Sequence, residues 1–149
     1  MFGLRLNEAK SMFFFDKSGK LMQAVDRATA RVLSAAGAYI RGCARKSLRY
    51  KSGPSKPPHP PHSHTGLLRD FIFFGYDASD RSVVIGPTLL RQQPEYGNLS
   101  VPEILEYGGI CTPMRRGKKY AVYAPRPYMG PAFEVGIERL PALWANSVK

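Results

Sequence analysis

The sequence predicts an α+β fold in which a long N-terminal helix packs on a small antiparallel sheet, together with a short helix and a C-terminal helix. Three observations favour this class: helical periodicity from residue 18 to about 48, two β-rich segments at 70–76 and 82–86, and a second helical pattern from residue 130 onward. An amphipathic helix must cover something, and the sheet face is the available partner. A chain of 149 residues suits one domain, 1–149.

The first helix is predicted from apolar residues that recur at steps of three and four. Asp16 or Ser18 is expected to cap its start, because their side-chain oxygens accept hydrogen bonds from orphan amide groups. Gly37 and Gly42 weaken the pattern, and a glycine inside a helix marks either a bend or a close approach. Cys43 falls on the apolar face and is expected to be buried and inert. The predicted apolar face comprises Leu21, Val25, Ala28, Val32, Ala36, Tyr39 and Cys43.

Positive charge is the strongest compositional anomaly, with a formal net charge of +11. Such a balance favours polyanions or acidic protein surfaces as partners. No acidic residue occurs between Asp26 and Asp70. Two interpretations stay open for the basic side of the helix: a solvated face, or a surface that meets DNA or an acidic partner. The candidate basic residues are Arg27, Arg31, Arg41, Arg45 and Arg49 on the helix and Arg115, Arg116, Lys118 and Lys119 in a predicted exposed turn.

A proline-rich segment follows the helix at about residues 50–65. Proline fixes φ and biases the preceding residue toward extended conformations, so a stiff polyproline II arm is expected. Such an arm would reach away from the body and lie on a neighbouring subunit. Its interface candidates are Pro57, Pro58, Pro60 and Pro61.

The remaining elements follow from local signals. Residues 70–76 and 82–86 flank "DASD" and predict a hairpin, and "GLRL" at 3–6 and "KYAVYA" at 119–124 predict further short strands. Ser100 and Glu103 have the spacing of a capping box, so "VPEILEY" is expected to be a helix that Gly108 stops. Glu103 and Glu106 share a face of this helix and are candidates for pairing with a basic surface of a neighbouring subunit. In the last helix, Phe133, Ile137, Leu140 and Trp144 form the predicted apolar face, and Pro141 is expected to kink or interrupt it.

Chemistry-bearing patterns are weak in this sequence. His59, His62 and His64 lie close together, but the intervening prolines oppose a compact metal site, and no Cys or carboxylate lies nearby in sequence. There is no GxSxG, P-loop or GxGxxG motif, and no helix-turn-helix, zinc-finger or KH pattern. We therefore expect no catalytic residue, no metal and no cofactor. Two cysteines without CxxC spacing, no signal-peptide core and no membrane-spanning stretch predict a soluble protein made in the cytoplasm.

The stretch "YAPRPYMGPAF" at 123–133 is predicted to be a rigid lead-in to the last helix. Pro125 and Pro127 hold it extended, and Pro131 suits the first turn of a helix. Two interpretations remain open: an anchor for the core, or a contact with a neighbouring subunit. Its interface candidates are Arg126, Tyr128 and Met129.

Several segments in this order resemble the neck, head–tail connector and tail-completion proteins of tailed bacteriophages. They are "PPHSHTGLLRDFIFFGYD", "SVVIGP", "VPEILEYGG" and "YAPRPYMGPAFE". The resemblance covers about residues 10–145 and implies a virion protein of the neck that forms a homo-oligomeric ring, a hexamer or a dodecamer. Its partners would be connector or stopper proteins, the tail tube or terminator, and genomic DNA that passes through the ring without sequence readout. A tail-terminator ring and a non-specific nucleic-acid-binding protein remain alternatives.

Overall fold

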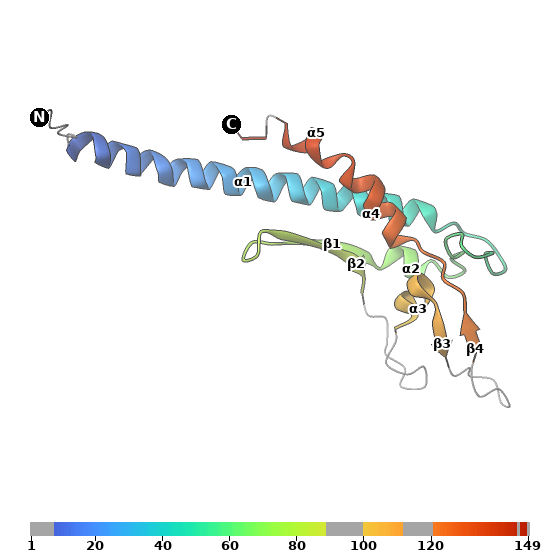
Figure 1. The fold of residues 1–149 in the computed structure, drawn as a ribbon. Helices are drawn as coiled ribbons and strands as arrows, with labels where there is room; N and C mark the ends of the chain where they lie inside the picture. The colour runs from blue at the N-terminus through green and yellow to red at the C-terminus, as the bar shows by residue number, and fades with distance from the viewer. Residues whose placement is uncertain (1–7, 89–99, 112–120, 146, 149) are drawn as a thin grey trace, which may run out of the picture.

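A computed structural model describes residues 8–88, 100–111, 121–145 and 147–148. Its dominant element is α1 (Glu8–Ser47), a helix of 40 residues and therefore about 60 Å long. The N-terminal part of α1 extends past every other described element, and all remaining elements gather along its C-terminal part (Figure 1). The helix starts ten residues before the predicted position, so Asp16 and Ser18 lie inside it rather than at its start. The strand expected at 3–6 lies outside the described residues.

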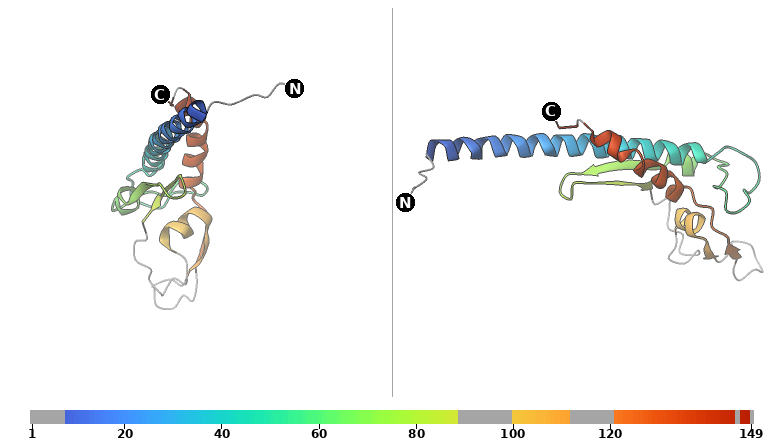
Figure 2. Two further views of the ribbon diagram at one scale, coloured as in Figure 1. Left: turned by 90° about the vertical axis from the view of Figure 1, so that its left-hand side faces the viewer. Right: turned by 45° about the horizontal axis from the view of Figure 1, so that its top comes forward.

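A β-hairpin runs along α1 (Figures 1 and 2). After the loop that follows α1, the one-turn helix α2 (Leu67–Asp70) leads into β1 (Ile72–Asp77), which pairs antiparallel with β2 (Ser82–Pro87). Residues of β1 alternate between the side facing α1 and the outer side, and Ile72, Phe74 and Tyr76 face α1. The predicted hairpin is confirmed. Gly37 marks a close approach, because a Cβ there would lie 2.8 Å from Val83 Cγ2.

The buried apolar side chains of α1 and of the residue that follows it recur at steps of four residues. They are Ala28, Val32, Ala36, Ile40, Ala44 and Leu48. Four residues span about 400°, so the buried stripe advances around the helix by about 40° at each step. Tyr39 and Cys43, which were predicted to belong to the apolar face, are half-buried beside this stripe, and Cys43 packs against the core. Leu21 is exposed, because it lies in the N-terminal part of α1, which extends past the other described elements.

The C-terminal segment crosses α1 as two short helices, α4 (Met129–Ile137) and α5 (Leu140–Trp144). Pro141 lies in the first turn of α5, which confirms the predicted interruption. The predicted apolar face is wrong: Phe133, Ile137 and Trp144 are exposed, and the small residues Ala132 and Gly136 are buried. A Cβ on Gly136 would overlap Ile40 Cγ1, so glycine lets the two helices approach closely.

A small unit below the C-terminal end of α1 contains α3 (Val101–Tyr107) and the antiparallel pair β3 (Gly109–Cys111) and β4 (Ala121–Tyr123) (Figure 1). The predicted capping box is present, and Gly108 ends α3 with a φ of 74°. The main core lies where α1, β1 and α4 meet, and it contains Ile40, Ala44, Leu48, Ile72, Tyr128 and Ala132. The α+β class is confirmed, and the four strands found among the described residues are arranged as two separate two-stranded sheets.

Candidate interaction surfaces

The arginine stripe of α1 divides into an exposed part and a bound part. Arg27 and Arg31 are exposed to solvent. Arg41 instead donates from Nε to the Ile72 carbonyl at 2.8 Å and lies over the Phe73 ring. Arg45 donates from Nε to the Arg69 carbonyl at 2.9 Å, and its Nη2 pairs with Asp70 at 3.3 Å. The expectation of one continuous basic surface is therefore wrong at Arg41 and Arg45, which fasten α2 and β1 to α1.

Of the other predicted basic residues, only Arg49 lies within the described part of the chain. Arg49 is exposed at the end of α1. Arg115, Arg116, Lys118 and Lys119 lie outside the described residues, so their turn remains a prediction. The described chain therefore offers Arg27, Arg31 and Arg49 as exposed members of the predicted basic surface.

The proline-rich segment forms a closed loop rather than an outward-reaching arm. The Ser63 amide donates to the Arg49 carbonyl at 2.9 Å, and Tyr50 pairs with Ser63 as an isolated parallel bridge. Satisfied backbone groups stabilise this closure, which the local preference of proline for extended structure does not encode. Among the interface candidates, Pro57 and Pro58 are joined by a cis peptide bond and are exposed, Pro60 is half-buried and Pro61 is buried.

Glu106 binds the first turn of another helix. Its Oε2 accepts hydrogen bonds from the amides of Tyr128 at 2.9 Å and Met129 at 3.1 Å, and its Oε1 accepts from Gly130 at 2.8 Å. These amides have no partner within α4, and a carboxylate also complements the positive end of the helix dipole. The expectation that Glu106 pairs with another subunit is therefore replaced by an intrachain role.

Two more interface candidates also have partners within the chain. Glu103 Oε2 accepts from both the amide and the hydroxyl of Ser100 at 2.7 Å, and these bonds lower the pKa of Glu103. Arg126 donates from Nε to the Ser55 carbonyl at 3.0 Å, and its amide donates to the Leu105 carbonyl at 2.7 Å. Arg126, which was predicted as an interface candidate, therefore makes these hydrogen bonds within the chain. It ties the proline-rich loop to the lead-in of α4.

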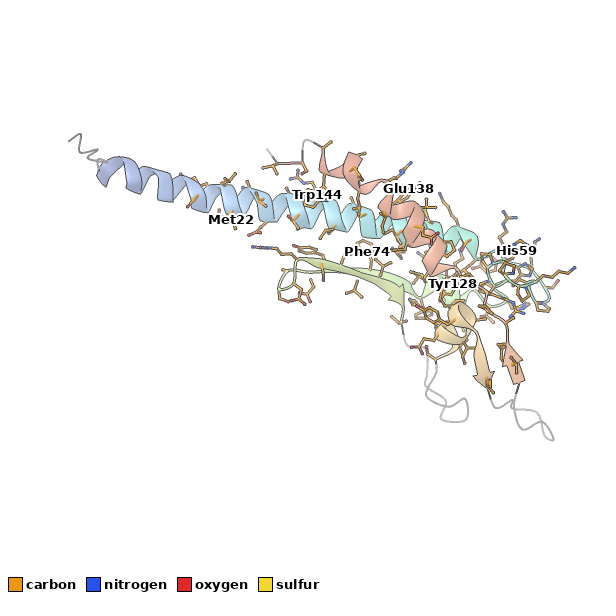
Figure 3. All side chains as sticks on the ribbon, viewed as in Figure 1. Met22, His59, Phe74, Tyr128, Glu138 and Trp144 are labelled. Atoms are coloured by element: carbon orange, nitrogen blue, oxygen red, sulfur yellow. The ribbon has the colours of Figure 1, made fainter. Side chains whose placement is uncertain are left out.

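Tyr128 belongs to the core and not to a surface. Only 1% of it is exposed, and it lies between α1 and the β1–α3 side of the molecule (Figure 3). Burial, and to a lesser extent the charge of Glu106, raise the pKa of its hydroxyl far above the ordinary value. Met129 is half-buried and packs against the same core. Of the two interpretations of this stretch, the structure favours the core anchor.

No cluster of three or more His, Cys, Asp or Glu side chains within the described residues is arranged to hold a metal ion. His62 Nδ1 lies 3.0 Å from the Gly53 carbonyl, which accounts for one of the three histidines locally. Cys43 is half-buried and has a free thiol. Of the helices that the structure describes, none is both long and apolar enough to cross a membrane.

Two exposed apolar surfaces were missed from the sequence. On the outer side of the hairpin, Phe73 and Val84 flank Gly75 and Gly86 along a shallow groove of about 350 Å³. On α4, Phe133 and Ile137 lie one turn apart and are both exposed. The signal for the first was present: "FIFF" is apolar at successive positions, so a strand built from it presents apolar side chains on both faces.

No protein-family model matches this chain, and no curated protein or solved structure matches it either.

Proposed function

We propose that this chain is a structural subunit of a homo-oligomeric ring in the neck of a tailed bacteriophage, where it joins the capsid connector to the tail. The ordered motifs from residue 10 to 145 support the family, as their resemblance to neck proteins implies. The observation that supports assembly into a ring is a pair of exposed apolar surfaces that differ in shape. One is a groove on the outer side of the hairpin, and the other is a ridge on α4.

The two surfaces differ in shape. Val84 is 69% exposed, and a Cβ on Gly75 or Gly86 would meet no atom within 4 Å, so the groove is open above its glycines. Phe133 is 52% exposed and projects with Ile137 from a helix. The hairpin and α4 flank α1 on different sides (Figure 2). A ridge on one copy that enters the groove of the next makes a heterologous contact, which closes into a ring when the rotation permits.

The ring is tested with one disabled surface at a time. Phe133→Glu should abolish the ridge and Val84→Glu the groove, because a charge buried at an apolar contact is costly. Each variant alone should fail to form rings in negative-stain images, whereas an equal mixture should give pairs, since one intact ridge still meets one intact groove. Val101→Glu, which adds the same charge at another exposed valine, serves as the control and should leave rings intact.

A strictly monomeric protein that joins neither the connector nor the tail of its phage would contradict the proposal. Incubation with tailless capsids and with free tails separates the neck from the tail-terminator alternative, because a terminator should add to tails first. Non-specific nucleic-acid binding is the second candidate function, which the net charge of +11 favours. Binding to duplex DNA that does not weaken as salt rises would exclude it.

A further inference from the structure

The closed proline-rich loop and the end of α1 surround a cavity of about 670 Å³. This volume lies within the range of ligand-binding sites. His59 belongs to the loop at the C-terminal end of α1, far from the projecting end of the helix (Figure 3). The basic side chains that line the cavity are Lys46, Arg49, Lys51, Lys56, His59 and His62.

The charge of this cavity is unbalanced. Four of its described lining residues are lysine or arginine, and none of them is aspartate or glutamate. No ion pair found among the described residues involves any of these four cations. The C-terminal end of α1 contributes at most about half a negative charge. The cavity therefore carries a net positive potential that an anion would relieve.

The walls of the cavity are held in place by the backbone. The His59 amide donates to the Lys56 carbonyl at 2.9 Å, and Ser63 closes the loop onto Arg49. Arg126 fixes the Ser55 carbonyl from the lead-in of α4, and Ser55 and Ser63 are both buried. The cations are thus presented from a fixed frame, which lowers the entropy cost of gathering them around a ligand.

We propose that this cavity binds phosphate groups, either as free phosphate species or in the backbone of duplex DNA. A phosphate or a run of phosphodiesters brings several negative charges into one place, as four clustered cations require, whereas a single carboxylate brings one. Lysine ammonium groups act as point charges for phosphate, and the arginine fork can bind two of its oxygens. Among the described residues, no Phe, Tyr or Trp lines the cavity, and contacts to phosphates carry no sequence information, so binding should be independent of base sequence. The proposal does not depend on ring formation.

The test measures binding of pyrophosphate and of duplex DNA of about 20 base pairs to the full chain at several salt concentrations. Lys51→Gln with Lys56→Gln should weaken both ligands. For DNA, the loss of two phosphate contacts should weaken binding by about tenfold or more near 0.1 M salt and make the salt slope shallower by about 1.8. The control variant, Arg81→Gln with Arg139→Gln, also loses two positive charges. These lie at the hairpin tip and in the segment between α4 and α5, outside the cavity. Its DNA affinity should stay within about twofold of the parent.

A second measurement needs no variant: pyrophosphate should protect Lys51 and Lys56 of the parent chain from chemical acetylation. DNA binding without pyrophosphate binding would assign the site to the nucleic-acid backbone, and the reverse would assign it to free phosphate species. The proposal is overturned if both double variants weaken DNA equally, because general charge would then explain the binding. It is also overturned if polyglutamate binds more tightly than DNA at equal salt, because an acidic protein would then be the partner.

Discussion

Arg27 and Arg45 lie on the same side of one helix, about five full turns apart, yet they have opposite environments. Arg27 is exposed, whereas Arg45 donates to a backbone carbonyl of α2 and pairs with Asp70. The difference arises from what covers the helix and not from the helix itself. Because the buried stripe advances by about 40° every four residues, the covered side near Ala44 is turned by about 160° from that near Ala28. A residue's direction on a long helix therefore does not decide its burial.

The largest expected effect follows from removing these two guanidinium groups one at a time. Arg45→Gln should lower the free energy of unfolding by about 1–2 kcal/mol, because the Arg69 carbonyl loses a charged donor. Arg27→Gln should change it by less than about 0.5 kcal/mol, as is usual for an exposed side chain without a specific partner. Urea denaturation of both variants measures the difference. Equal losses would mean that the two ends of the stripe are equivalent after all.

The fold class was predictable from sequence because it depends on local periodicity. The hairpin, the capping box at Ser100 and the interruption at Pro141 each need only neighbouring residues, and each is present. The interaction residues were less predictable. Arg41, Glu106 and Arg126 all act on backbone atoms of segments far away in sequence, and such partners are defined only by the tertiary arrangement.

The predicted apolar face of the last helix was wrong for the same reason, because its burial also depends on residues far away in sequence. In α4, small residues are buried and large ones are exposed, which reverses the usual pattern of an amphipathic helix. Helices approach closely only where side chains are small, so the position of Gly136 opposite Ile40 decides which face turns inward. The exposed large residues are then available for a second copy of the chain, which the proposed ring requires.

Two glycines of α1 sharpen the contrast between covered and open faces. Gly37→Ala should destabilise the protein by about 1 kcal/mol, because the new methyl group would meet Val83 and Phe74 at less than 3 Å. Gly42→Ala should stabilise it by about 0.5–1 kcal/mol, because nothing lies within 4 Å and alanine favours the helix. Thermal unfolding of the two variants should shift in opposite directions. A stabilised Gly37→Ala variant would show that the hairpin yields at this contact.

The smallest effect on stability at neutral pH is expected for two tyrosines, of which one is buried and the other is exposed. Burial raises the pKa of Tyr128 above its ordinary value of 10.0, whereas Tyr107 is 80% exposed. Above about pH 10 the unfolded chain ionises this tyrosine while the folded chain keeps its proton. The stability that Tyr128 contributes is therefore fully present below pH 10 and declines as pH rises toward the folded pKa.

Tyr128→Phe should flatten this alkaline loss of stability, because a phenylalanine has no proton to release in either state. Tyr107→Phe should leave the slope unchanged and serves as the matched control. Chemical denaturation between pH 8 and about 11 measures both slopes. If Tyr107→Phe flattened the curve as much as Tyr128→Phe, alkaline unfolding would follow general charge repulsion, and burial beneath α1 would not be its cause.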